Sequence, residues 1–143
     1  MKIKEVKKFD INVYNAVVRL LPQLSSISKP LTKKHFKKIL KSKNTHFFIA
    51  KLDKEIIGTL ILVNYNILVG TKYWIEDVII DEAHRGKGYG KELTQFAIDY
   101  AKSDGAEAIN LTSHPARIAA NQLYQKLGFT RIETNLYRFY VNE

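Results

Sequence analysis

The sequence contains no cysteine among its 143 residues. This absence excludes disulfide bonds, metal sites built from thiolates, and any reaction that passes through an acyl-cysteine intermediate. The four histidines show neither HxxxH nor HxH spacing. We therefore also expect no metal site built from histidine and carboxylate side chains.

Long hydrophobic runs are missing as well. No apolar run reaches the roughly 18 residues that a membrane span needs, and the N-terminal residues MKIKEVKKFD have no apolar block of the kind found in secretory signals. Hydrophobic residues make up 45% and charged residues 26%, which is an ordinary globular composition. We expect one domain over residues 1–143, located in the cytoplasm and without a membrane partner.

Acidic residues are few relative to basic ones. The chain has 23 Lys and Arg against 14 Asp and Glu, and a net charge of +9. A positive field attracts polyanions such as nucleic acid, and equally a cofactor that carries several phosphates. Seven lysines fall between Lys29 and Lys43. A solvated helix face is the simplest interpretation of this run, and its role stays open.

The hydrophobic pattern predicts an α/β domain with the element order βααβββαβαββ. Asp10 and Thr32 are placed to cap the first two helices. THFFIAKL and EIIGTLILVNY then alternate as a β-hairpin around Asp53 and Lys54, and KYWIEDVIID is a third long strand. The remaining elements are a helix over 91–103, a strand in AEAINLTS, a helix over 115–127, and a terminal strand pair around Thr134 and Asn135.

A glycine-rich loop between a buried strand and a helix is the sharpest local feature. Its sequence is Arg85-Gly86-Lys87-Gly88-Tyr89-Gly90. The glycines let backbone N–H groups turn toward one point, and the helix N-terminus with Arg85, Lys87 and Lys91 adds positive charge, which suits a pyrophosphate. The alternative is that the glycines only make a sharp loop. Neither GxGxxG nor GxxxxGK[ST] is met, so those two nucleotide-binding folds are excluded.

Two separated motifs carry a family resemblance. Arg85-x-x-Gly88-x-Gly90 resembles the [QR]xxGx[GA] signature of the GNAT superfamily of N-acetyltransferases. The stretch ANQLYQKLGF from Ala120 to Phe129 resembles the second landmark of that superfamily, although the spacing from Asn121 to Tyr124 is three residues instead of the commoner five. The resemblance implies the GNAT fold, a central mixed and mostly antiparallel sheet of six to seven strands flanked by four helices.

The resemblance also implies acetyl-CoA as cosubstrate. Val78, Ile79 and Ile80 of the preceding strand would pair through their backbone with the pantetheine arm, and the glycine-rich loop would bind the pyrophosphate. Asn121 would hydrogen-bond the pantetheine or its phosphate side. Tyr124 would lie near the thioester sulfur as the acid, although a tyrosine of the amphipathic core is the alternative. Besides Asn121 and Tyr124, the residues implied for cofactor binding are Val78, Ile79, Ile80, Arg85, Gly86, Lys87, Gly88, Tyr89, Gly90 and Lys91.

The residue that acts as the base is less clearly indicated than the acid. Alternation along a strand places Glu76 and Asp77 on opposite faces, and the I-E-D segment resembles that of glucosamine-phosphate and some polyamine acetyltransferases, in which the glutamate faces the active site. Glu76 is therefore the candidate base, with orientation of the substrate or pairing with a lysine as its alternative roles. Asp77, His114 or water could act instead, and His114 could equally cap the following helix. A backbone N–H near Val78 or Ile79 is the expected oxyanion donor.

These residues favour an enzyme that transfers an acetyl group directly from acetyl-CoA to a primary amine. The acceptor, a small molecule or a peptide, stays open, and so does a homodimer. The alternative is a catalytically degenerate acetyl-CoA-binding module or a basic nucleic-acid-binding module. Nucleic acid is not expected as a partner, because the chain lacks an RNA-binding aromatic motif and a clear recognition helix.

Overall fold

The computed structural model describes residues 1–24 and 29–141, which fall into two compact units, Met1–Thr112 and Ser113–Glu143. Each unit is described by itself. The first contains β1 (Lys2–Glu5), α1 (Ile11–Leu20), α2 (Lys33–Lys41), β2 (Thr45–Leu52), β3 (Glu55–Ile67), β4 (Gly70–Ile80), α3 (Tyr89–Ser103) and β5 (Ala108–Leu111), with 3-10 turns at Leu21–Gln23 and Glu82–His84. The second contains α4 (Ile118–Lys126).

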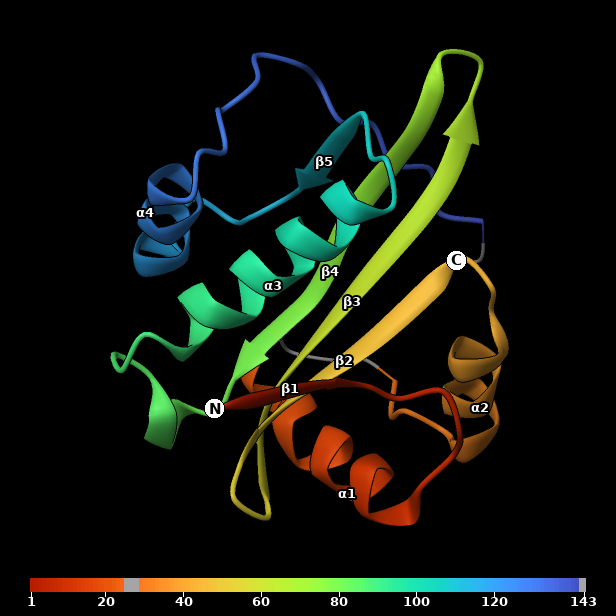
Figure 1. Cartoon of the computed structure of the whole chain (residues 1–143), viewed down its shortest axis with the longest axis vertical. Coiled ribbons are helices and arrows are strands. Elements are labelled where there is room, and N and C mark those ends of the chain that lie inside the picture. Colours follow the sequence, from red (N-terminus) through yellow and green to blue (C-terminus); the bar gives the residue numbers. More distant parts are fainter. Residues whose placement is uncertain (25–28, 142–143) are drawn as a thin grey trace. The chain divides into compact units, whose positions relative to one another are not determined.

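The sheet has five strands in the order β1-β2-β3-β4-β5 (Figure 1). Neighbouring strands are antiparallel except β4 and β5, which run parallel. The predicted α/β class, the mixed and mostly antiparallel sheet and the four helices are therefore confirmed. The predicted count of six to seven strands is wrong for the described residues, in which five are found.

The missing strands are the predicted terminal pair around Thr134 and Asn135. Residues 129–140 contain no strand. Two strands by themselves are marginal in water and need a further strand or a helix to cover their apolar face, and the described part of Ser113–Glu143 offers no strand for them to join. The large apolar side chains of this segment are accordingly exposed, namely Ile132, Leu136, Tyr137, Phe139, Tyr140 and Val141.

Local signals place the helices and the hairpin of the first unit. The Asp10 carboxylate accepts hydrogen bonds from the Asn12 and Val13 N–H groups at 2.7 and 3.2 Å, and caps α1. The Thr32 hydroxyl caps α2 in the same way. Asp53, with φ 49°, turns the chain between β2 and β3 as predicted. No helix in the described residues is long and apolar enough to cross a membrane.

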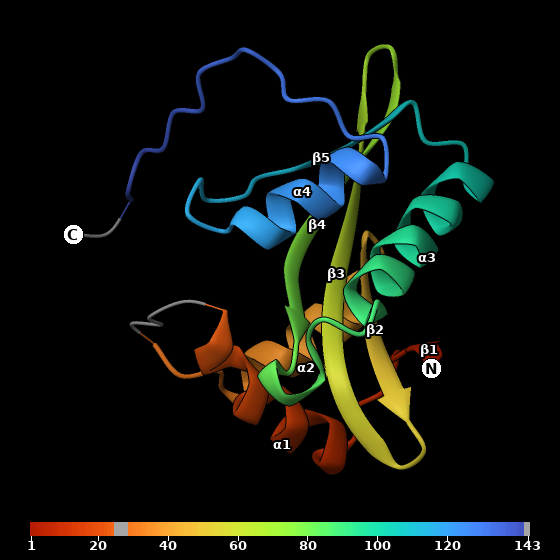
Figure 2. The same cartoon turned by 90° about the vertical axis from the view of Figure 1, so that its left-hand side faces the viewer.

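Helices cover both faces of the sheet, with α1 and α2 on one face and α3 on the other (Figures 1 and 2). The alternation of β2 explains this arrangement. Phe47 packs edge-on against Phe36 of α2, with ring centroids 5.3 Å apart. The next residue, Phe48, points the opposite way and packs edge-on against Phe96 of α3 at 5.2 Å. The sheet is thus buried on two sides and holds the ends of β4 and α3 in place.

Candidate functional site

The glycine-rich loop lies where the sequence predicts it, after the end of β4 at Ile80 and leading into α3 at Tyr89. Gly86 and Gly88 have φ angles of 77° and 86°, in the left-handed region that favours glycine. A Cβ built at either position would meet no atom within 4 Å. The glycines are therefore required by the backbone conformation, and the space beside them is open.

The backbone donors of this loop are unused. Within residues 1–24 and 29–141, the N–H groups from Gly86 to Lys91 donate to no hydrogen-bond acceptor; the first helical bond of α3 runs from the Glu92 N–H to the Gly88 carbonyl at 3.1 Å. The positive end of a 15-residue helix lies among them. Such a cluster of free donors beside a helix N-terminus is suited to bind an anion.

Asp81 fixes the start of this loop. It follows β4 directly and is only 5% exposed. Its carboxylate accepts from the Arg19 guanidinium, from the Gln23 amide at 3.5 Å and from the Ala83 N–H at 3.3 Å. Arg19 also donates to the Ile56 carbonyl at 2.8 Å. The hydrogen bond from Arg19 holds the pKa of Asp81 below its ordinary value.

Gln23 adds a second link between the end of α1 and the loop. Its side-chain oxygen accepts from the Glu82 N–H at 2.9 Å and from the Arg85 guanidinium at 3.4 Å. Arg85 also donates through Nε to the Ile80 carbonyl at 2.9 Å. Arg85 is therefore held against the strand end that precedes the loop. No local sequence pattern identifies Arg19 or Gln23, because their partners Asp81, Glu82 and Arg85 lie about 60 positions further along the chain.

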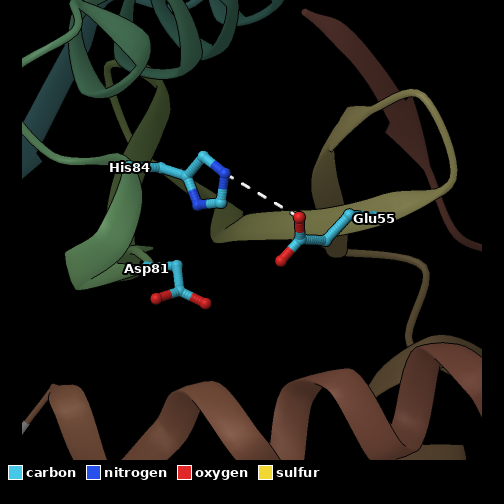
Figure 3. A group of neighbouring side chains, drawn as sticks. All are labelled: Glu55, Asp81 and His84. Carbon is cyan, nitrogen blue, oxygen red and sulfur yellow. Dashed lines mark ion pairs between the residues drawn. The ribbon is translucent and has the colours of Figure 1, made fainter.

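His84 and Glu55 lie beside Asp81 (Figure 3). Ligand atoms of the three side chains lie within 4.8 Å of one another, and His84 Nε2 is 3.8 Å from Glu55 Oε2. These donor types could hold a divalent cation, but the Asp81 carboxylate is already paired with Arg19. We therefore interpret the group as a cluster of polar side chains in which His84, before the loop, lies beside Glu55 of the β2–β3 hairpin.

A β-bulge interrupts β4 just before the loop. Ile61 pairs with Glu76 and Thr59 pairs with Ile79, so β4 has one more residue than β3 across this interval. Asp77 lies in the bulge with φ 48°. The alternation argument that puts Glu76 and Asp77 on opposite faces does not hold here, because the extra residue breaks the two-residue period. Both carboxylate residues are exposed.

One edge of β4 is unpaired beyond the bulge. β5 pairs with β4 only from Lys72 to Ile75, so residues 76–80 have no strand on that side in the described part of Met1–Thr112 (Figure 1). The predicted pantetheine-pairing residues Val78, Ile79 and Ile80 belong to this stretch. An unpaired edge offers backbone N–H and C=O groups to an extended ligand.

The two candidate bases differ in their surroundings. Desolvation raises the pKa of Asp77 above its ordinary value. A raised pKa brings a carboxylate closer to the range in which it can take a proton near neutral pH. Glu76 lies on the regular side of the bulge, and it engages in interactions of its own. The structure thus keeps both carboxylates as candidates.

Asn121 and Tyr124 both lie on α4, in the second unit. The Asn121 amide donates to the carbonyls of His114 and Arg117, each at 2.9 Å. Tyr124 packs edge-on against Phe129, with ring centroids 5.9 Å apart. Desolvation raises the pKa of Tyr124 above its ordinary value.

His114 serves the turn before α4. Its Nδ1 accepts from the Ala116 N–H at 3.1 Å, and its side chain is exposed. This contact lies in the turn and does not cap α4, whose N-cap residue is Arg117 and has no side-chain capping bond. α4 itself begins at Ile118, three residues after the predicted start at Pro115.

Comparison with known sequences matches the model of the Acetyltransferase (GNAT) family to residues 14–129. N-alpha-acetyltransferase 30 of Schizosaccharomyces pombe is 30% identical over 118 residues, which cover 81% of this chain and 77% of that protein. The uncharacterized N-acetyltransferase YobR of Bacillus subtilis is 32% identical over 91 residues. That match covers 64% of this chain but only 36% of YobR.

Solved structures share the fold. A putative acetyltransferase from Agrobacterium tumefaciens superposes with a TM-score of 0.86 at 20% identity, covering 98% of this chain and 100% of that one. Glucosamine-6-phosphate N-acetyltransferase from Arabidopsis thaliana superposes with a TM-score of 0.78 at 21% identity, covering 98% and 99%. At these identities the likeness concerns the fold.

Proposed function

The chain belongs to the Acetyltransferase (GNAT) family, and from this premise we propose that it transfers the acetyl group of acetyl-CoA directly to a primary amine. The loop Arg85–Gly90 is the observation that carries the proposal. It combines two left-handed glycines, unused backbone donors and the N-terminus of α3. This arrangement supports a site for the pyrophosphate of the cosubstrate.

The free edge of β4 supports the position of the pantetheine arm. Val78, Ile79 and Ile80 end β4, and only Asp81 and the 3-10 turn Glu82–His84 separate them from the loop, so a ligand that pairs with their backbone would run toward it. Arg85, Lys87 and Lys91 would add positive charge around the phosphates. Asn121 is proposed to contact the pantetheine or phosphate side, which requires its amide to exchange a contact that it now makes with the turn before α4. Residues 1–143 would then act as one N-acetyltransferase domain.

Acetyl-CoA supplies an activated thioester. The amine nitrogen forms a bond to the carbonyl carbon, the carbon–sulfur bond breaks, and the amine loses one proton while the sulfur gains one. We assign the first proton to Glu76 as base and the second to Tyr124 as acid. A backbone N–H near Val78 or Ile79 would stabilise the carbonyl oxygen as it gains negative charge.

The Tyr124 phenol has a proton to donate at neutral pH, although desolvation raises its pKa and makes it a weaker acid than a solvated tyrosine. The raised pKa of Asp77 makes this residue the strongest competitor of Glu76 for the base. The two residues are adjacent in the chain and both are exposed, so a direct comparison of variants is needed.

The acceptor is proposed as a small-molecule or peptide amine. The names of the relatives support both a peptide acceptor and a small-molecule acceptor. N-alpha-acetyltransferase 30 is named for the amino group of a chain terminus, and the structural neighbours include an aminoglycoside acetyltransferase and a glucosamine-6-phosphate N-acetyltransferase. A panel of peptides and amino sugars would distinguish these acceptors by thiol release.

Calorimetric titration of acetyl-CoA into the purified protein tests the proposal, with ATP and desulfo-CoA as comparison ligands. We expect micromolar binding of acetyl-CoA that ATP does not reproduce. Gly88→Glu should abolish binding, because it places a carboxylate among the loop donors. Gly105→Glu is the matched control, since Gly105 also has a left-handed φ, 78°, with no atom within 4 Å of a Cβ. Equal binding by both variants would remove the loop from the site.

A further inference from the structure

The exposed surface of α2 is almost entirely basic. Its exposed residues are Lys33, Lys34, His35, Lys37, Lys38 and Lys41, and Phe36 is the fully buried one. The Phe36 side packs into the core cluster with α1 and β2. The apolar side of the helix is therefore used inside the protein, and the lysines face solvent.

The net charge of the chain comes from the region around this helix. Residues 11–52 contain nine Lys and Arg and no Asp or Glu. The rest of the chain has 14 basic and 14 acidic residues, which cancel. The excess of +9 is thus confined to one continuous stretch, with α2 near its middle.

This charge is unfavourable for the helix itself. Lys33 and Lys34 lie in the first turn, at the positive end of the helix dipole, and no acidic residue accompanies them. Lys34 and Lys38 are four residues apart, a spacing at which like charges repel. Among the described residues, none of the α2 lysines forms an ion pair. An anionic partner would remove this repulsion.

The same face is open. Lys34, Lys37, Lys38 and Lys41 lie together on it, and the neighbouring Thr32, His35 and Ser42 are also polar. Nine residues of helix are about 13 Å long. A row of ammonium groups over this length can contact several successive phosphates of a nucleic-acid strand.

We propose that the outer face of α2 binds the phosphate backbone of nucleic acid without reading its bases. Interfaces with protein partners usually have aromatic or apolar residues at their centre, and lysine is depleted there. The outer face of α2 exposes no such aromatic or apolar residue. Insertion into a membrane requires a free apolar helix face, whereas that of α2 is buried. Lys33 and Lys37 lie over the rings of Tyr14 and Phe9, 5.9 and 4.7 Å from their centroids. Within the described residues Lys34, Lys38 and Lys41 make no such contact, and these three are suited to phosphates.

Backbone binding needs neither an aromatic motif nor a recognition helix. Their absence argues against sequence-specific binding, and it leaves charge-driven binding untouched. The proposal does not rest on the acetyltransferase activity. It adds a second surface, which would hold the protein near RNA or DNA while the site at the β4 end remains separate.

Fluorescence anisotropy with a labelled single-stranded RNA of mixed sequence tests this surface. The variant Lys34→Gln/Lys38→Gln/Lys41→Gln removes three charges from the outer face of α2. Lys2→Gln/Lys54→Gln/Lys102→Gln removes three charges from exposed lysines elsewhere, so the two variants have the same net charge. Circular dichroism establishes that both variants fold, and acetyl-CoA titration should give the parent affinity for both.

We expect the α2 variant to bind RNA about tenfold or more weakly, and the slope of log K against log salt to become shallower by about 2, since each phosphate contact on a single strand contributes about 0.7. The control variant should change both quantities much less. Equal losses in the two variants would mean attraction by net charge alone and would overturn the proposal. Tighter binding of polyglutamate or of phosphatidylserine vesicles through the same lysines would also overturn it, in favour of an acidic protein or a membrane.

Discussion

The guanidinium of Arg19, near the end of α1, is hydrogen-bonded to the carboxylate of Asp81 at the point where β4 leaves the sheet. The two residues are 62 positions apart in the chain. Asp81 is 5% exposed, and it begins the segment that leads to the glycine-rich loop. The position of the proposed pyrophosphate site therefore depends on a helix that contributes nothing to the loop itself.

Arg19→Met should destabilise the protein and loosen the loop. The variant leaves a nearly buried carboxylate without its cation, and a buried charged group that loses its partner costs about 1–3 kcal/mol or more. The side chain of Arg19 is 46% exposed, which favours the lower part of that range. Urea unfolding measures the free energy of unfolding, and calorimetry should show weaker acetyl-CoA binding.

Lys7→Met is the control for this variant. Lys7 pairs with Glu5 at 3.1 Å, but its side chain is 74% exposed. Exposed pairs contribute little, so we expect a loss of less than about 0.5 kcal/mol and unchanged binding. Similar losses in the two variants would show that the Arg19–Asp81 pair is no stronger than an ordinary surface pair.

The same pair predicts a dependence of stability on pH. The pKa of Asp81 is lowered by folding, so its contribution is complete above the unfolded value of about 3.9 and is lost as the pH falls through the folded pKa. Asp81→Asn should be less stable than the parent at pH 7 and should lose less stability between pH 5 and pH 2. Urea midpoints across this range measure it; parallel pH curves would contradict the assignment.

Much of the fold follows from local sequence signals. Asp10 and Thr32 are cap residues directly before helical apolar patterns, and the structure uses both as caps. The period-two stretches around Asp53 form the hairpin. The predicted terminal strands do not form, because strand formation there depends on contacts beyond the local sequence. Residues 129–141 are rich in aromatic and β-branched residues, which favour strands, but a strand also needs a neighbouring strand, and that requirement cannot be derived from the segment alone.

The site was predictable only in part. The glycine spacing locates the loop, because left-handed φ angles at Gly86 and Gly88 call for glycine. The bulge at Asp77 was not predictable, since aspartate rarely has a positive φ and the pairing with β3 imposes it. Arg19 was missed because its partner lies far along the chain, and no spacing rule connects the two.

Glu76→Gln and Asp77→Asn distinguish the two candidate bases. Each removes one charge with little change in shape, and the two positions are adjacent. If Glu76 is the base, its variant should lower kcat/KM by about 100-fold or more and remove the acidic limb of the pH profile. Asp77→Asn should then keep that limb. The reverse result would transfer the role to Asp77, in line with its raised pKa.

Tyr124→Phe should lower kcat while leaving the affinity for acetyl-CoA close to that of the parent. The substitution keeps the ring against Phe129 and removes only the hydroxyl that is proposed to protonate the leaving sulfur. A loss of about 100-fold is expected for a general acid. Tyr137→Phe, at an exposed tyrosine of the same unit, should have the parent's rate. Equal turnover in the two variants would remove Tyr124 from the acid role.

Tyr73→Phe tests the packing that holds β4 against α3. Tyr73 is fully buried, its hydroxyl donates to the carboxylate of Asp104 at the end of α3, and it accepts from the Asn64 amide at 3.3 Å. The variant leaves both partners without this contact, so a loss of about 1–3 kcal/mol is expected in urea unfolding. Tyr65→Phe, at a partly exposed tyrosine of β3, should change stability by less than about 0.5 kcal/mol.

Alkaline pH gives an independent measure of the same contact. Burial, together with the hydrogen bond to Asp104, raises the pKa of Tyr73 to about 12. The unfolded chain releases this proton near pH 10, so the stabilisation is complete below pH 10 and declines as the pH rises toward 12. Tyr73→Phe lacks the phenol and should show a smaller decline over this interval than the parent. If the two declines are equal, the phenol of Tyr73 is not held in its protonated form by the fold, and the link from β4 to α3 is apolar packing alone.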